Sequence, residues 1–195
     1  MPPLGQQFFS QPTVDLAKAL LGKYLVFGDL QGKIVETEAD LFRDDPGCHA
    51  SRGLTRRNAP MFGPAGHSYV YLIYGMYYCL NIVSGKPGEG EAVLIRALQP
   101  LKGIELMQKR RGTKKIEELC NGPGKLCQAF GITLKHNNLS LFEGKLRIHD
   151  NREKPEIATS TRIGLSQGKE LELRFFIKES RFVTKRASNK VSKKV

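Results

Sequence analysis

The sequence predicts an α+β fold: a single domain, residues 1–184, with a curved, mixed or antiparallel β-sheet, flanking helices and a protruding β-hairpin. Helical and strand-like segments are interleaved along the 195 residues, which indicates a mixed class. Short turns join the strand-like segments in pairs, as in antiparallel hairpins. No internal repeat or linker divides the chain, and its 40% apolar content suffices for one core.

The first elements are a helix and a hairpin. The segment "TVDLAKALLG" (13–22) predicts a short helix, because Thr13 can cap its start and Gly22 can end it. The segment "KYLVFGDLQGKIVETEA" (23–39) predicts a strand, a turn at residues 29–32 and a second strand.

The region between residues 43 and 68 is rich in Gly, Pro and Arg and lacks apolar periodicity, so we expect a long loop that carries function. Arg52, Arg56 and Arg57 lie in it and are candidate phosphate contacts. A basic loop that is merely solvated is the alternative.

Five of the six tyrosines lie in "YVYLIYGMYY" (69–78). Gly75 and Met76 between two strand-like runs predict a type II′ turn, with Tyr74 as the last residue before it. Tyr74 either folds back over its own hairpin or is a wedge that enters a nucleic-acid groove and unstacks a base step. Tyr71 lies on the opposite strand face and could line a pocket behind the tip.

The second half of the chain alternates helices and strands. "EAVLIRAL" (91–98) predicts a strand ended by Pro100, and the closing strands are expected at residues 138–142, 145–150 and 170–178. Residues 101–111 and 114–131 are helical in pattern, interrupted at "NGPG" (121–124). The amides of the helix start there, together with Lys125, could bind a phosphate; the GK[ST] pattern of a nucleotide P-loop is absent.

The net charge of +12 favours a polyanion as partner. The last eleven residues, 185–195, carry five basic groups and no acid, which predicts a flexible basic tail. The chain has neither a secretory leader nor a run of ~18 apolar residues, so we expect an intracellular protein without a membrane partner.

The cysteines and histidines do not form a metal-binding pattern. No two cysteines form a CxxC pair and their flanks are apolar, which predicts reduced thiols in the core and neither a metal nor another cofactor. The residues concerned are Cys48, Cys79, Cys120, Cys127, His49, His67, His136 and His149.

"IVETEAD" places Glu36 and Glu38 on one strand face. Two interpretations are open at this point. The pair could lie on an exposed edge, or one carboxylate could serve glycosidic chemistry, in which such a group acts as acid or base.

Several consecutive motifs carry a family resemblance. "GKIVETEA", "HASRG", "RRNAPMFGPAGHSYVYLIYGMYYCLNIVS", "AVLIRALQP" and "GPGKLCQA" occur in order between about residues 20 and 131, with weaker similarity through "RIGLS" to the last strand. They resemble the alkyladenine (3-methyladenine) DNA glycosylase family. The resemblance implies hydrolysis of the N-glycosidic bond of alkylated or deaminated purines in duplex DNA, without a cofactor.

The resemblance also implies roles for individual residues. Glu38 would be the general base that activates water, and Arg96 would help to hold both. Tyr74 would fill the gap left by the flipped nucleotide, with Met76 beside it at the intercalating tip. The flipped base would contact Tyr71 and His49, and Asn81 at the pocket edge would help to exclude guanine.

One position departs from the family pattern. After "ETEA" the family has a tyrosine that stacks on the flipped base, whereas this chain has Asp40. Asp40 shares a strand face with Glu38, and a neighbouring like charge raises a carboxyl pKa. Asp40 could instead turn outward or attract a cationic base.

The sequence therefore predicts a monofunctional, monomeric glycosylase acting on double-stranded DNA with a damaged purine, because no lysine lies in the matched catalytic motifs. Its expected location is the bacterial cytoplasm with the nucleoid, or the nucleus in a eukaryote. One competing hypothesis is a non-catalytic DNA-binding protein that scans for damage or bends DNA. The other is an RNA-binding module of the translation apparatus, which rests on charge alone.

Overall fold

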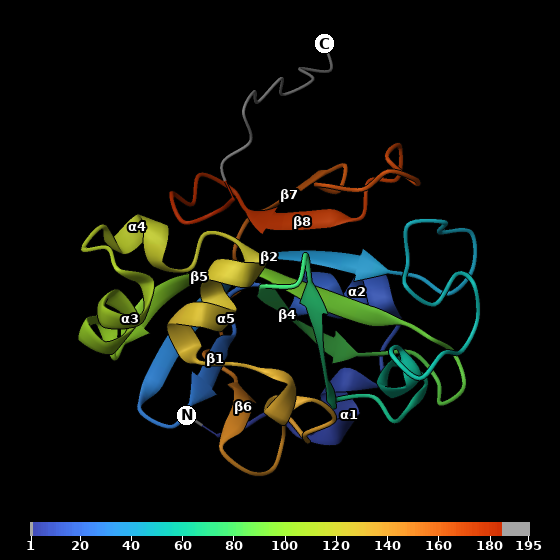
Figure 1. Cartoon of the computed structure of the whole chain (residues 1–195), viewed down its shortest axis with the longest axis horizontal. Coiled ribbons are helices and arrows are strands. Elements are labelled where there is room, and N and C mark those ends of the chain that lie inside the picture. Colours follow the sequence, from blue (N-terminus) through green and yellow to red (C-terminus); the bar gives the residue numbers. More distant parts are fainter. Residues whose placement is uncertain (1, 185–195) are drawn as a thin grey trace.

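The computed structural model describes residues 2–184, and its centre is a curled antiparallel sheet (Figure 1). The strand order is β3-β4-β5-β2-β1-β6, and β8 pairs with both β2 and β7. The strands of the described range are β1 (Tyr24–Phe27), β2 (Leu30–Asp40), β3 (Ser68–Ile73), β4 (Tyr77–Val83), β5 (Ala92–Lys102), β6 (Leu146–His149), β7 (Ile157–Ser160) and β8 (Arg174–Ile177). The predicted single-domain α+β class is confirmed, and the pairings between these strands are antiparallel.

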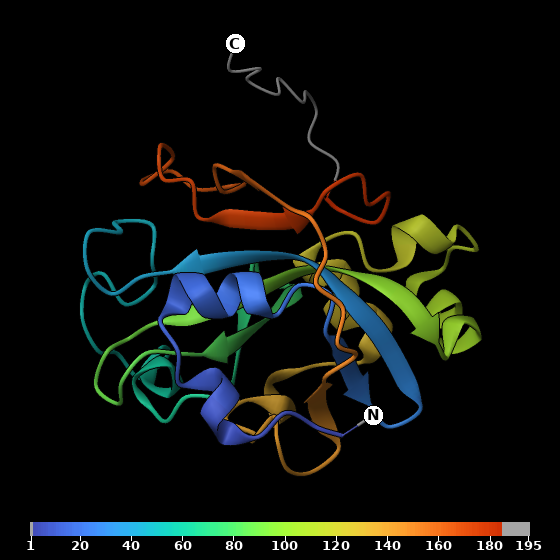
Figure 2. The same ribbon diagram turned by 180° about the vertical axis from the view of Figure 1, so that it is seen from behind.

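Short helices pack against this sheet. In the described part of the chain they are α1 (Gln6–Phe9), α2 (Thr13–Ala19), α3 (Ile104–Arg111), α4 (Ile116–Leu119) and α5 (Pro123–Phe130), with 3₁₀ turns η1 (Ala59–Phe62) and η2 (Leu134–His136). Figure 2 shows α2 lying across the long strands from behind, while α5 lies on the side seen in Figure 1. None of the helices between residues 2 and 184 has the length and apolarity needed to cross a membrane.

The two longest strands, β2 and β5, set the curvature. Their pairing contains register shifts between residues 31 and 32 and between residues 34 and 37. Bulges of this kind bend a strand and increase its twist. The curled sheet can then pack α2 and α5 around one apolar core, which includes Leu16 of α2 and Phe130 of α5.

Because side chains alternate along a strand, the two faces of the sheet carry different sets of residues. Thr37 of β2 faces α2, because its hydroxyl donates to the Ala17 carbonyl at 2.9 Å. Glu36 and Glu38 therefore project from the opposite face. A second, smaller apolar cluster on this opposite face is formed by Cys48, Ala50, Met61, Tyr69, Tyr71, Cys79, Val83, Ala92 and Leu94.

Local chemistry accounts for most of the predicted elements. The helix predicted at 13–22 is present as α2, but Thr13 does not cap it; its hydroxyl lies 2.8 Å from the Ser84 hydroxyl. The hairpin at 23–39 is present as β1–β2, but its turn lies at residues 28–29 and not at 29–32. The long loop after Asp40 contains only the short η1 turn. Within this loop the buried Asn58 donates to the carbonyls of His49 and Gly53, so its conformation is fixed by internal hydrogen bonds. The four cysteines are buried and free, as predicted.

The turn of the β3–β4 hairpin differs from the prediction. Tyr74 and Gly75 both have positive φ, 53° and 70°, and the Met76 amide donates to the Ile73 carbonyl at 3.2 Å. These φ values suit the centre of a type I′ turn, so the predicted type II′ turn with Gly75 and Met76 at its centre is wrong. Tyr74 belongs to the turn and does not precede it.

Two further expectations are wrong, and two elements were not predicted. Pro100 does not end β5, which runs to Lys102. The strand tolerates a proline there because β4 pairs only with residues 92–94 of β5, so no hydrogen bond to β4 requires a backbone N–H at residue 100. Residues 138–142 form a single bridge at Ser140. The pattern missed α1 and β7, which are four residues each and too short to show a period. The predicted tail at 185–195 lies outside the described residues.

Candidate functional site

The candidate site begins as one row of side chains across the sheet. Glu38 of β2 pairs with Leu94 of β5, Leu94 with Asn81 of β4, and Asn81 with Tyr69 of β3. Directly opposed residues share a sheet face. The register therefore brings four predicted segments together on the face that is turned away from α2.

An arginine joins the two glutamates of β2. Arg96 donates from Nε to Glu36 Oε1 at 3.1 Å and from Nη1 to Glu38 Oε2 at 3.0 Å. Glu36 is 0% and Glu38 3% exposed, so the interpretation as two acids on an exposed edge is wrong. Removing the charge of Arg96 would leave two buried carboxylates without their shared cation, a change that typically costs about 3–5 kcal/mol.

The two glutamates differ in how many partners hold them. Glu36 also accepts from Arg174 Nε at 2.7 Å and from the Thr184 amide at 2.6 Å. Glu38 Oε1 accepts from the Ile163 amide at 2.8 Å. Glu36 is thus a structural anion within a network, whereas Glu38 has one arginine and one amide.

Burial raises the pKa of Glu38 above its ordinary value of 4.5, and the Glu36 charge acts in the same direction, while Arg96 and the Ile163 amide oppose the shift. A carboxylate with a raised pKa is a stronger base than one in water. Such tuning is characteristic of general bases that work near neutral pH.

Aromatic rings line the same face beside Glu38. The His49 and Tyr71 rings lie 4.3 Å apart in an edge-on arrangement, and His49 Nδ1 lies 3.2 Å from the Tyr69 hydroxyl. Burial, followed by the nearby Arg57 charge, lowers the pKa of His49, so its neutral form is favoured. The Arg57 guanidinium lies over the Tyr71 ring, 5.4 Å from its centroid.

Asn81 lies on this face but at its base. It is 1% exposed, and its side-chain amide donates to the Tyr69 carbonyl at 3.0 Å. In this arrangement Asn81 fixes the β3–β4 hairpin beneath the rings.

Asp40 lies at the end of β2 and turns toward Arg162. Its Oδ1 accepts from Arg162 Nη1 at 2.8 Å, and its side chain is 21% exposed. Burial raises the pKa of Asp40 to about 7 despite the Arg162 charge, and the Glu38 and Asp45 charges add to the rise.

Sequence reasoning missed Arg162, Asp45 and Arg174. All three are at most 4% exposed, and Arg162 pairs with both Asp40 and Asp45. The weak "RIGLS" similarity was the available signal for Arg162. No local pattern links it to β2, because more than 100 residues separate the partners.

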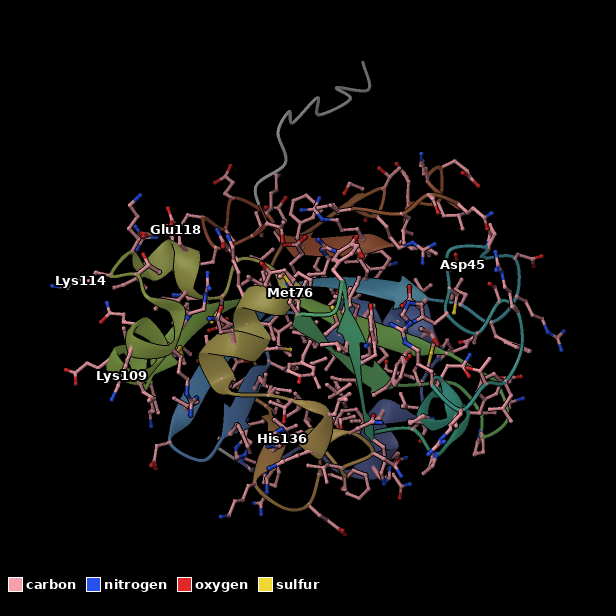
Figure 3. All side chains as sticks on the ribbon, viewed as in Figure 1. Asp45, Met76, Lys109, Lys114, Glu118 and His136 are labelled. Atoms are coloured by element: carbon pink, nitrogen blue, oxygen red, sulfur yellow. The ribbon has the colours of Figure 1, made fainter. Side chains whose placement is uncertain are left out.

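The hairpin tip is the most exposed apolar part of the site region. Tyr74 is 79%, Met76 65% and Tyr77 47% exposed, so Tyr74 does not fold back over its own hairpin. Figure 3 shows Met76 beside α5, where Tyr77 packs so closely on Gly124 that a Cβ there would lie 3.1 Å from the Tyr77 Cβ. The tip is therefore supported by the first turn of α5.

The predicted phosphate contacts occupy different surroundings. Arg52 and Arg56 are exposed, and Arg52 and His49 line a hollow of about 280 Å³ between the long loop and residues 165–167. Arg57 donates to the Leu72 carbonyl at 2.7 Å, which attaches the loop to β3. Lys125 donates to Asn121 Oδ1 at 2.8 Å across the start of α5.

No three His, Cys, Asp or Glu side chains gather as a metal site among residues 2–184. The polar groups of the site are instead carboxylates, arginines and one neutral imidazole. In this set a carboxylate can act as a general base, the arginines can bind phosphates, and the rings can contact a planar ligand.

Comparisons with known proteins agree with this chemistry. The model of the family described as Methylpurine-DNA glycosylase (MPG) matches residues 7–181. A protein of Methanoculleus marisnigri named "Putative 3-methyladenine DNA glycosylase" is 49% identical over 92% of this chain and 97% of its own length. Proteins with the same name from Carboxydothermus hydrogenoformans and Rhodopseudomonas palustris are 48% and 45% identical, covering 94% of this chain and 99% and 90% of their own lengths. The chain therefore belongs to the methylpurine-DNA glycosylase family, whose members are hydrolases that act on DNA.

Proposed function

We propose that this protein is a monofunctional glycosylase that removes alkylated or deaminated purines from double-stranded DNA, leaving an abasic site. The observation that carries the proposal is the state of Glu38. It is a buried carboxylate with a raised pKa, held by Arg96 and the Ile163 amide, on the same sheet face as Tyr71 and His49.

Glu38 acts as the general base. A purine inside a duplex hides its glycosidic bond, so the damaged nucleotide leaves the stack before reaction. Loss of the base produces an oxocarbenium-like sugar, which a nearby carboxylate stabilises. Glu38 accepts a proton from the attacking water, and Arg96 keeps its carboxylate oriented. No lysine belongs to this set of side chains, so the reaction stops at the abasic site.

Tyr71 and His49 form one wall of the base pocket. Alkylation at a ring nitrogen makes a purine cationic and a better leaving group, and an aromatic face attracts such a cation by roughly 0.5–2 kcal/mol. In the free protein the Arg57 guanidinium, itself a planar cation, lies over the Tyr71 ring. Arg57 leaves this face to a cationic base when it turns to the phosphates. Asn81, fixed below the rings, limits the depth of the pocket and helps to exclude guanine.

The hairpin tip replaces the extruded nucleotide. Tyr74 intercalates with Met76 beside it, and the exposure of both side chains supports this role. Filling the gap offsets part of the few kcal/mol that unstacking requires. Arg52, Arg56, Arg57 and Lys125 contact the phosphates on either side.

Replacing Glu38 tests the proposal directly. We expect Glu38→Gln to bind a duplex containing 3-methyladenine or hypoxanthine like the wild type, but to release base at least about 100-fold more slowly, because a general base contributes 10²–10⁴-fold. Single-turnover release of free base measures the loss. Glu118→Gln, an exposed change on α4, is the matched control. Undiminished excision by Glu38→Gln would assign the base elsewhere.

Asp40 favours one alternative, a non-catalytic protein that scans DNA for damage, because it removes an aromatic face from the pocket. Tight binding of damaged duplex with no release from any lesion by the wild type would support that alternative. A panel of 3-methyladenine, hypoxanthine and ethenoadenine duplexes, run with Asp40→Tyr in parallel, also tests substrate range. A changed order of substrates in Asp40→Tyr would place residue 40 against the base.

A further inference from the structure

Arg162 is the most enclosed cation near the candidate site. Its side chain is 0% exposed, and Nη1 donates to the Ala39 carbonyl at 3.1 Å, to Asp40 at 2.8 Å and to Asp45 Oδ2 at 2.7 Å. Nη2 donates to the other oxygen of Asp45. This forked contact joins the end of β2 to the segment that contains residue 162.

Asp45 extends the connection into the long loop. Its carboxylate accepts from the Leu41 amide at 3.1 Å and from the Gly47 amide at 3.0 Å. A Cβ on Gly47 would lie 3.0 Å from Arg162 Nη2, and one on Gly168 would lie 3.2 Å from the same atom. The guanidinium thus lies against two glycines, where a side chain at either position would crowd it.

The residue after Arg162 reaches Glu38. The Ile163 amide donates to Glu38 Oε1 at 2.8 Å, whereas Arg96 holds the other oxygen. Ile163 is separated from β2 by more than 120 residues, so the position of its amide depends on what anchors that segment. The pairing of β7 with β8 holds the segment as far as Ser160. Beyond Ser160, the contacts of Arg162 with Ala39, Asp40 and Asp45 anchor it to residues that lie one to seven positions after Glu38.

We propose that Arg162 is a positioning residue for Glu38: its forked contact with Asp45 and Asp40 fixes the peptide that follows, so that the Ile163 amide orients the Glu38 carboxylate. The importance of orientation for the reaction rests on the proposed function. The positioning itself is a property of the folded chain and can be measured without any excision.

The geometry of the fork makes lysine an informative substitute. Arg162→Lys keeps the positive charge but has one nitrogen, which cannot pair with both oxygens of Asp45 and also reach Asp40 and Ala39. The charged and titratable groups around Glu38 are Arg96, Glu36, Asp40, Arg162 and Cys79. The variant keeps a positive charge at residue 162, so it tests the loss of the rigid fork without removing the cation that faces Asp40 and Asp45.

The first measurement is the titration of the Glu38 side-chain carboxyl by ¹³C NMR in wild type and Arg162→Lys. The hydrogen bond from Ile163 lowers the pKa of Glu38, so its weakening raises that pKa. We expect an upward shift of about one pH unit, the size that corresponds to a weakened hydrogen bond to a charged group. An unchanged Glu38 titration in folded Arg162→Lys overturns the proposal.

The second measurement is the pH dependence of single-turnover base release, corrected for the folded fraction. In Arg162→Lys we expect the acidic limb to move upward with the Glu38 titration and the maximum rate to fall on the order of tenfold to a hundredfold, as for a misplaced reacting group. The dissociation constant for damaged duplex should change by less than about threefold, because the interaction acts on the chemical step. A rate loss without movement of the acidic limb means a merely structural role and overturns the proposal.

Two further variants complete the design. Ile163→Pro removes the donating amide directly and should reproduce the shift of Glu38 even if Arg162→Lys fails to fold. Lys23→Gln breaks the partly buried pair between Lys23, just before β1, and Asp150, just after β6. It controls for general loss of stability, so it should leave the Glu38 titration unchanged. An unchanged titration in Ile163→Pro also overturns the proposal. If wild type releases no base, the proposed function fails, whereas the NMR titrations still decide the role of Arg162.

Discussion

The three carboxyl groups in the second half of β2 have different electrostatic surroundings, because each has a different set of ion-pair partners. Glu36 is neutralised by two arginines, Glu38 shares one of them, and Asp40 relies on Arg162, which is itself bound to Asp45. Burial raises the pKa of both Glu38 and Asp40. Three acids within five residues can therefore have three different roles.

Asp40 should make the stability of the protein depend on pH. Its pKa is about 7 in the folded chain against an ordinary 3.8, so its contribution is full below pH 3.8 and is lost as pH rises through 7. Between pH 5 and pH 8 this loss amounts to about 2.5 kcal/mol of unfolding free energy. Urea unfolding at the two pH values should show the loss in wild type and a correspondingly smaller one in Asp40→Asn. Equal losses in both proteins would contradict the assignment.

The strands position these residues in two ways: alternation decides the face from which a side chain projects, and register decides which residue lies opposite it. The period of two in "IVETEA" was sufficient to predict that Glu36 and Glu38 share a face, and the predicted hairpins and long loop are present. The position of the turn could not be predicted, because Tyr74-Gly75 and Gly75-Met76 both contain a glycine that accepts positive φ. The anchor at Arg162 could not be predicted either, because it depends on tertiary contacts far apart in sequence.

The β3–β4 turn places a bulky residue in a strained conformation. Tyr74 has φ 53°, a region that costs a non-glycine residue roughly 1–2 kcal/mol. This conformation is therefore a destabilising contribution at residue 74, which a substitution can measure.

Comparing Tyr74→Gly with Tyr74→Ala separates strain from function. Both variants lose the ring, but only glycine adopts positive φ freely, so Tyr74→Gly should be about 1 kcal/mol more stable than Tyr74→Ala. Thermal or urea unfolding measures this difference. Both variants should bind damaged duplex more weakly than wild type, because neither can fill the gap in the stack. Wild-type affinity in both would show that the ring is not an intercalating wedge.

At the scale of the whole molecule, the net charge of +12 should make binding to DNA strongly dependent on salt. The slope of log affinity against log salt concentration falls by about 0.9 for each phosphate contact removed. Arg52→Gln and Arg56→Gln should each reduce the slope by about that amount, as measured by titrations at several salt concentrations.

Lys109→Gln is the control for this measurement. Lys109 belongs to α3, and Figure 3 shows it at the opposite side of the molecule from Asp45, which lies in the long loop with both arginines. This substitution should leave the slope unchanged. Equal effects from all three substitutions would mean that the charge acts as a diffuse field and that the loop makes no phosphate contacts.

The alternation along β2 has a consequence for any attempt to redesign this enzyme. Residues 35, 37 and 39 serve the interior while residues 36, 38 and 40 carry the ionisable groups. Deleting one amino acid upstream of Glu38 would exchange the two faces of the strand, so that the ionisable side chains would point into the apolar core and the apolar side chains toward the candidate site. Catalysis and folding thus depend on the same alternation, so a change of register would disrupt both.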